Sequence, residues 1–275
     1  MAVSDSLMAD CHMHTPRCNH AEGSVVDYAR AAVAAGLDEI GISDHSPMPA
    51  EWDDGWRMRA DELDGYVAEV LAIRDQFSDR LTVRLGLEVD WRPGCEEYVR
   101  QLSERYPWDY LIGSVHYLGD WAFDDPDERG RWSVVGVGAT YCQYFEQVAA
   151  SASSGLFDII GHPDLAKKFA HRPAEDEVEE VLAAESSMLD AVAAAGVALE
   201  VSSAGLRKPC AEIYPASRIV AAAAQRDIPF SYGSDAHAPD LVGYGLQECR
   251  QLLVDCGVGA ISSFCQRQRS SSVLA

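Results

Sequence analysis

The sequence reads Met8-Ala9-Asp10-Cys11-His12-Met13-His14-Thr15 where the first β-strand is predicted. Successive side chains of a strand point to opposite faces, so His12 and His14 project the same way and are expected to share one pocket. His20 follows in the next loop. A pair of histidines near the beginning of a chain also occurs in solvated loops, so the rest of the sequence has to distinguish a metal site from a loop.

A helix and a second strand follow this segment. Apolar residues recur at helical spacing from Ser24 to Ala35, and Gly36 is suited to end that helix. The apolar run Ile40-Gly41-Ile42 comes next and leads into Ser43-Asp44-His45-Ser46-Pro47. This order predicts a β-α-β unit.

The same alternation continues along the whole chain. Strands are expected at 81–89, 110–116, 157–160, 197–201 and 229–233, and helices at 60–76, 95–105, 140–151, 175–195, 215–225 and 246–256. Residues 119–136 are expected to form an irregular insertion, and the polar tail 266–275 is expected to be frayed. About seven strands without a linker between them predict one parallel α/β domain over residues 1–265.

Charge and apolar content exclude several classes of partner. Asp and Glu number 44 against 22 for Lys and Arg, which gives a formal net charge of −22. Such a field repels nucleic-acid phosphate, so no nucleic-acid partner is expected. No signal segment begins the chain, and no apolar run reaches the roughly 20 residues needed to span a bilayer. We therefore expect a cytoplasmic protein without a membrane partner, while its oligomeric state stays open.

The sequence indicates neither a paired-cysteine site nor a common nucleotide-binding site. The eight cysteines show no Cys-x-x-Cys spacing and are expected to be reduced and mostly buried. The two common nucleotide-binding fingerprints, Gly-x-Gly-x-x-Gly after a strand and the Gly-rich phosphate loop that ends in Lys-Ser or Lys-Thr, are absent. Histidines and carboxylates are left as the candidates for chemistry.

These ionisable side chains gather at one end of the predicted strands. The histidines at or just beyond the carboxyl ends of strands are His12, His14, His45, His116, His162 and His237, and Glu88 and Asp235 hold the same kind of position. In barrels of alternating strands and helices this end carries the active site. A pocket of so many imidazoles and carboxylates needs counterions, and mixed ligands of this kind suit Zn²⁺, Mn²⁺ or Fe²⁺. The number of candidate ligands predicts more than one metal.

Seven segments over residues 10–237 form a longer pattern. They are Asp10-Cys11-His12-Met13-His14-Thr15 with His20, Gly41-Ile42-Ser43-Asp44-His45-Ser46-Pro47, Gly86-Leu87-Glu88, Gly113-Ser114-Val115-His116, Gly161-His162-Pro163-Asp164-Leu165, Gly205-Leu206-Arg207-Lys208 and Ser234-Asp235-Ala236-His237. In this order they resemble the polymerase and histidinol-phosphatase (PHP) superfamily, and within it the histidinol-phosphatase branch. The resemblance implies a distorted, TIM-like (β/α)7 barrel with a trinuclear metal centre.

The resemblance also implies a ligand set for three divalent ions of manganese, zinc or iron. One metal would be held by His12, His14, Glu88 and Asp235, the second by Glu88, His116 and His162, and the third by His20, His45 and His237. The eighth histidine, His171, matches no motif and is expected in a surface loop.

The implied reaction is hydrolysis of a phosphate monoester, with L-histidinol phosphate of histidine biosynthesis as the preferred substrate. Arg207 is expected to bind the phosphate oxygens, and Lys208 next to it is a second candidate for substrate binding. Asp235 is a candidate proton donor to the leaving group, and His237 and Arg207 complete the catalytic candidates. Asp44 is expected to orient an imidazole and is also grouped with the substrate contacts.

Several alternatives stay open. The substrate could be another small phosphate ester such as a nucleotide. A non-catalytic metal-binding regulatory module is less favoured, because none of the nine ligand positions is replaced. Lys167 and Lys168 could serve a phosphate or lie at the surface, and Trp52 and Trp56 could form a lid or a packed surface loop.

Two observations concern the rim of the expected site. The carboxylates Glu51, Asp53, Asp54 and Glu200 could meet a cationic substrate, although a solvated or structural role is favoured for each. The segment Val201-Ser202-Ser203-Ala204 stands where the resemblance leads us to expect an asparagine. Substrate contacts at that strand end are therefore the least determined part of the prediction.

Overall fold

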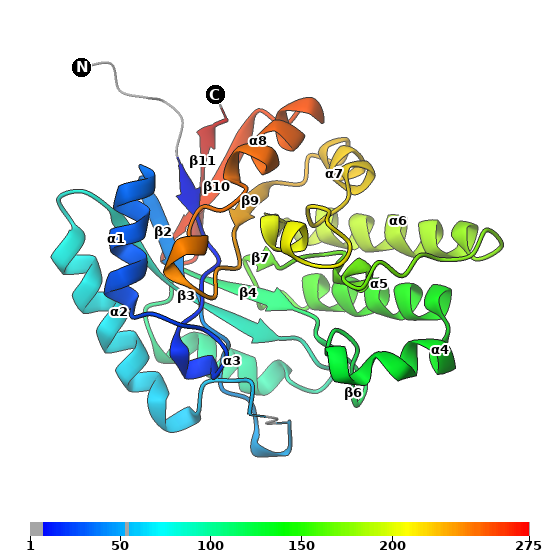
Figure 1. The fold of residues 1–275 in the computed structure, drawn as a ribbon, viewed down its shortest axis with the longest axis horizontal. Coiled ribbons are helices and arrows are strands. Elements are labelled where there is room, and N and C mark those ends of the chain that lie inside the picture. The colour runs from blue at the N-terminus through cyan, green and yellow to red at the C-terminus, as the bar shows by residue number, and fades with distance from the viewer. Residues whose placement is uncertain (1–7, 53–54, 275) are drawn as a thin grey trace.

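A parallel sheet forms the centre of the fold. The computed structural model describes residues 8–52 and 55–274. Within this part of the chain, seven parallel strands follow one another in the order β1-β2-β3-β4-β7-β8-β9 (Figure 1). Their bounds are β1 (Ala9–Asp10), β2 (Glu39–Ile42), β3 (Thr82–Asp90), β4 (Tyr110–Ser114), β7 (Ile159–Ile160), β8 (Ala198–Ser202) and β9 (Phe230–Gly233).

The sheet nearly closes into a barrel because its first and last strands meet. The backbone N–H of Cys11 donates to the Tyr232 carbonyl (2.9 Å), and that of His14 donates to the Ala236 carbonyl (2.9 Å). The second of these bonds and the bond from the Ala236 N–H to the His12 carbonyl (3.2 Å) form a parallel bridge between Met13 and Ala236. The predicted distorted (β/α)7 barrel is confirmed, although β1 covers only two of the residues predicted as a strand at 8–15.

A helix follows each strand of the barrel. The bounds are α1 (Val25–Ala35), α2 (Leu63–Phe77), α3 (Glu96–Arg105), α5 (Val137–Ser153), α6 (Val178–Ala195), α7 (Ser217–Ala224) and α8 (Leu246–Asp255). The helices surround the sheet, and α5 and α6 pack side by side (Figure 1). As predicted, α1 ends at Gly36, whose φ of 76° is left-handed. Among the described residues, no helix combines the length and the apolarity that crossing a bilayer requires.

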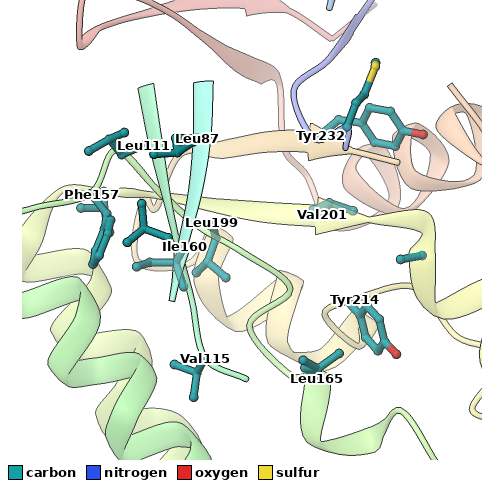
Figure 2. Close-up of a cluster of buried hydrophobic side chains, with 14 of the residues drawn as sticks. Leu87, Leu111, Val115, Phe157, Ile160, Leu165, Leu199, Val201, Tyr214 and Tyr232 are labelled. Carbon is teal, nitrogen blue, oxygen red and sulfur yellow. The ribbon is translucent and has the colours of Figure 1, made fainter. Parts of the chain in front are cut away.

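Side chains alternate between the two faces of the strands. Leu87, Leu111, Ile160 and Leu199 face the helices and belong to the main hydrophobic core (Figure 2). The opposite, inner face carries a second buried cluster, which consists of Ala9, Cys11, Tyr110, Ile112, Ile159, Ala198 and Phe264. This inner cluster fills the barrel with apolar groups away from the carboxyl ends of the strands. The predicted metal ligands lie at the other end.

The ring of Tyr110 occupies the inside of the barrel. Its hydroxyl donates to the Cys11 carbonyl at 2.6 Å, so it reaches from β4 across to β1. A Cβ atom at Gly41 would lie 1.7 Å from the tyrosine hydroxyl oxygen, and one at Gly86 would lie 2.5 Å from the ring. Both positions therefore require glycine, because contacts this short are not tolerated between non-bonded atoms.

The structure corrects two expectations about irregular segments. The insertion predicted at 119–136 contains a hairpin partner, β6 (Trp121–Ala122), paired with β5 (Tyr117–Leu118), and the short helix α4 (Trp132–Val135). The tail predicted to be frayed at 266–275 contains β11 (Gln268–Val273), which pairs antiparallel with β10 (Ala260–Cys265). Phe264 of β10 contributes to the inner cluster, so tertiary packing orders a polar segment whose own sequence does not predict it.

Candidate metal centre

The barrel brings all nine predicted ligand side chains to the carboxyl ends of its strands. The contributing segments are β1 and the loop after it (His12, His14 and His20), the segment after β2 (His45), β3 itself (Glu88), and the segments after β4 (His116), β7 (His162) and β9 (Asp235 and His237). Side chains from residues 12 and 237 meet here because β1 and β9 lie next to each other. Burial decreases from His12 and His14 at the bottom of the cluster to His20, which is exposed.

The ligands predicted for one metal face a common point. Nε2 of His14 lies 3.0 Å from Oδ1 of Asp235 and 3.6 Å from Oε2 of Glu88. Nε2 of His12 lies 3.4 Å from that same glutamate oxygen. The two imidazole nitrogens and Oε2 are buried without a hydrogen-bond partner. Buried atoms of this kind are normally satisfied, so this donor set fits a metal ion.

Glu88 presents its second oxygen to a different pair of histidines. Oε1 lies 3.1 Å from Nε2 of His162 and 3.8 Å from Nε2 of His116. Since Oε2 faces His12 and His14, the carboxylate stands between two groups of imidazoles. This arrangement matches the bridging position predicted for it.

The histidines predicted for the third metal lie above this pair of groups. The ring of His20 is 4.7 Å from that of His237 and 5.3 Å from that of His45, centroid to centroid. Donor atoms within 4.8 Å of one another group as His14, His45 and His237, and as Cys18, His20 and His237. Cys18 is a donor at this position that the sequence analysis does not include.

In the metal-free protein, a protonated imidazole helps to balance the negative charge of the buried carboxylates. Burial disfavours the charged form of His14, yet the nearby carboxylates of Asp235 and Asp44 raise its pKa to about 9. Burial instead lowers the pKa of His45 and of His237 to about 3, and the charge of His14 lowers that of His237 further. His14 is therefore cationic in the metal-free protein, while His45 and His237 are neutral.

We expect metal binding to release protons and to strengthen as the pH rises from 6.5 to 8.5. An imidazole must be neutral to ligate, and His14 keeps its proton up to about pH 9 in the metal-free protein. Calorimetric titration with Zn²⁺ in two buffers of different ionisation enthalpy measures the number of protons released. An affinity that stays constant over this pH range, with no proton release at pH 7, would contradict the expectation.

Each innermost histidine has a carboxylate behind it. Nδ1 of His12 lies 2.6 Å from Glu200, Nδ1 of His116 lies 2.5 Å from Asp90, and Nδ1 of His14 lies 3.5 Å from Asp44. Asp90 also accepts a hydrogen bond from the Arg57 guanidinium. Such partners fix the ring orientation and leave Nε2 free to ligate.

Three of these contacts bear on the sequence predictions. Asp44 is fully buried and does not line the cavity next to the centre, so the structure supports its orienting role and not a substrate contact. Glu200 is buried as well, which fits the structural role favoured for it and not the alternative of a contact with a cationic substrate. Its signal in the sequence was a single charge inside the apolar run Ala198-Leu199-Glu200-Val201. Asp90 could have been found from its i, i+2 spacing to Glu88.

A cavity of about 440 Å³ opens next to the histidine cluster. Its lining includes the candidate ligands His45, Glu88, His116, His162, Asp235 and His237, the cations Arg57, Lys168, Arg207 and Lys208, and the carboxylates Asp124, Asp125 and Asp127. An anionic group in this cavity would thus be met by cations, while the partly exposed Asp125 and the exposed Asp127 offer negative charge. A small molecule with an anionic head and a cationic end fits this distribution.

Hydrogen bonds hold the guanidinium of Arg207 in place and leave one of its nitrogens unpaired. Its Nη2 donates to the carbonyls of Ser234 (2.8 Å) and Asp235 (3.0 Å), and its guanidinium lies over the ring of Tyr244. Nη1 is buried and has no hydrogen-bond partner. Lys208 lines the same wall, where burial lowers its pKa.

The structure separates two lysines that the sequence left open. Lys168 lines the cavity and is held by the carboxylate (2.9 Å) and the carbonyl (2.7 Å) of Asp124. Lys167 is buried away from the cavity and pairs with Asp164 at 2.8 Å. Only Lys168 is placed to meet a substrate.

The remaining predicted rim residues lie in different surroundings. Trp56 lines the cavity, and its ring meets that of His20 edge to face, with the two centroids 5.3 Å apart. Trp52 packs under Arg92 instead. Glu51 is exposed, and Asp53 and Asp54 lie outside the described residues. His171 stacks on Trp132 away from the cavity. All eight cysteines are free, and five of them are buried, as predicted.

Known proteins are similar to this chain in sequence. A model of the PHP domain family matches residues 10–204. A protein of Deinococcus radiodurans named "Probable histidinol-phosphatase" is 46% identical over 250 residues, which cover 91% of this chain and 94% of the relative. The histidinol-phosphatase of Bacillus subtilis is 30% identical over 258 residues, covering 86% and 96%.

A solved structure has the same fold. The histidinol phosphate phosphatase of Lactococcus lactis, crystallised with zinc, L-histidinol and phosphate, superimposes with a TM-score of 0.82 at 20% identity, covering 96% of this chain and all of the other. At this level of identity the likeness establishes the barrel and nothing further.

Proposed function

Because the chain belongs to the PHP domain family, we propose that it is a metal-dependent phosphatase that hydrolyses L-histidinol phosphate to L-histidinol and phosphate. One observation carries this proposal: nine histidine and carboxylate side chains converge at one end of the barrel, and seven of them line a cavity that arginine and lysine side chains line as well. Relatives at 46% and 30% identity bear the name of the same activity. We place the enzyme in the biosynthesis of histidine.

We propose three divalent ions of zinc, manganese or iron in the centre. His12, His14, Glu88 and Asp235 would hold the first, Glu88, His116 and His162 the second, and His20, His45 and His237 the third. When bound, closely spaced ions of this kind supply a hydroxide for attack on phosphorus and neutralise the phosphoryl oxygens. The buried Nε2 and Oε atoms without hydrogen-bond partners support this assignment.

The residues of the chain position the phosphate against the centre. Arg207 is expected to donate its unused Nη1 to a phosphoryl oxygen, while its other bonds hold the guanidinium still. Lys208 and Lys168 add positive charge at the same wall. Burial opposes the ionisation of Asp235, but His237 and His14 hold its pKa well below the usual range, so as a ligand it has no proton to give to the leaving group.

We propose that Asp125 and Asp127 of the cavity lining recognise the cationic end of the substrate. Replacing Asp125 and Asp127 together by asparagine should raise KM for histidinol phosphate about threefold to tenfold, since partly exposed charge pairs contribute about 0.2–1 kcal/mol each. Activity on p-nitrophenyl phosphate, which has no cationic end, should not change. Glu128→Gln is the matched control, because Glu128 lies in the same turn but does not line the cavity. Equal losses on both substrates would contradict this role.

The overall proposal is tested by phosphate release from a panel of esters. Histidinol phosphate is expected to be hydrolysed far faster than sugar phosphates, nucleoside monophosphates or p-nitrophenyl phosphate, and chelation of the metals should abolish all activity. A strong preference for a nucleotide would replace the proposed substrate. Tight metal binding without hydrolysis of any ester would indicate a regulatory module instead.

A further inference from the structure

Glu200 is a buried carboxylate that the proposed reaction does not use. It lies on β8 between Leu199 and Val201, which face the main core (Figure 2), and it is 1% exposed on the inner face of the barrel. The neighbouring strand leaves room for it, because a Cβ atom at Gly233 would lie 2.0 Å from Oε1. A charge at this depth needs partners, and it has two.

The first partner of Glu200 is the ring of His12. Oε1 lies 2.6 Å from Nδ1 of that histidine, so Nδ1 carries the proton and donates it. Nε2 is thereby left as the nitrogen with the lone pair, and it faces Oε2 of Glu88 at 3.4 Å. Glu200 thus selects which nitrogen of His12 can ligate.

The second partner is the backbone of His162. Its N–H donates to Oε2 of Glu200 at 2.7 Å. His162 has a φ of 24°, a conformation that residues other than glycine rarely adopt and that surrounding contacts must maintain. The hydroxyl of Tyr144 supplies another such contact by donating to the His162 carbonyl at 2.8 Å. In this conformation Nε2 of His162 lies 3.1 Å from Oε1 of Glu88.

We propose that Glu200 is a positioning residue that couples the two metal positions sharing Glu88. One of its oxygens orients His12, a ligand of the first position, and the other holds the backbone of His162, a ligand of the second. The coupling rests on the ligand assignment of the proposed function. Asp90 provides the comparison, because it bonds the ring of His116 alone among the nine ligands.

The test compares variants of these two carboxylates by metal content and metal affinity. Glu200→Ala is expected to weaken Zn²⁺ binding at two positions by roughly 10–100-fold each, whereas Asp90→Asn weakens one. Glu200→Gln keeps the size of the side chain and can still accept from the His162 N–H. Its amide would donate to Nδ1 of His12 and thus move the ring proton to Nε2, so this variant should lose one position only.

Bound Zn²⁺ per chain is measured by atomic emission, affinity by chelator competition, and the melting temperature of the metal-free protein serves as the structural control. Loss of a single ion in Glu200→Ala, or a lowered melting temperature with wild-type affinity, would overturn the coupling. If the alanine variant does not fold, a Glu200→Gln variant with wild-type affinity at every position overturns it equally. Wild-type protein that binds fewer than two ions would contradict the proposed function itself.

Discussion

Replacing Glu88 by glutamine is expected to lower kcat/KM for histidinol phosphate on the order of 10⁴-fold, as when one member of a catalytic unit is lost. Its two oxygens face different groups of imidazoles, at 2.9–3.8 Å. Burial opposes its ionisation, yet His45 and His12 hold its pKa well below the usual range, so it is a carboxylate at any working pH. A neutral amide would supply one weaker oxygen where two negative ones are needed.

The matched control for this variant is Glu39→Gln. Glu39 is also a buried strand carboxylate, but it lies at the opposite end of the barrel, where it pairs with Arg84 at 2.7 Å. Its replacement should change the melting temperature and leave kcat/KM within about twofold of the wild type. Phosphate release and metal content are measured on both variants. A folded Glu88→Gln protein with a tenth or more of the wild-type kcat/KM would contradict the bridging role.

Replacing Arg207 by alanine is expected to lower kcat/KM by about 10²–10³-fold while the metals stay bound. Removal of one preorganised donor to a developing negative charge has an effect of this size. The preorganisation is visible in the structure, since the carbonyls of Ser234 and Asp235 and the ring of Tyr244 fix the guanidinium and leave Nη1 unpaired.

Two further variants define what Arg207 contributes. Arg207→Lys keeps the charge but not the planar fork, so it should recover only part of the activity. Arg172→Ala removes an arginine that pairs with Glu212 outside the cavity and should leave the kinetics unchanged. Loss of metal together with activity in Arg207→Ala would show that this residue supports the centre and does not bind phosphate.

The barrel and eight of the nine converging side chains were predictable because both depend on local pattern, and the resemblance to the PHP superfamily added His20. Alternation of apolar runs and helical periodicity placed the strands and helices within about three residues of their observed bounds, except that the first strand ends five residues early, and parallel strands bring their carboxyl ends to one side. The i, i+2 spacing of His12 and His14 was enough to place both rings in one pocket, 5.0 Å apart by centroids.

The supporting residues could not be predicted in the same way. Glu200 is 188 positions from the histidine that it orients, and strand periodicity tells which face it occupies but not which side chain lies across the barrel. The β10–β11 hairpin was missed for a related reason. Its serine-rich strand has no apolar alternation of its own and is ordered by the partner strand with which it pairs.

The meeting of β1 and β9 has a consequence for how the protein is made. The centre takes side chains from residue 12 and from residue 237, so a chain emerging from the ribosome cannot assemble it until almost all of the barrel has been synthesised. Contacts between segments so distant in sequence form late in folding. Unfinished chains would therefore lack a complete metal site and could not hydrolyse phosphate esters.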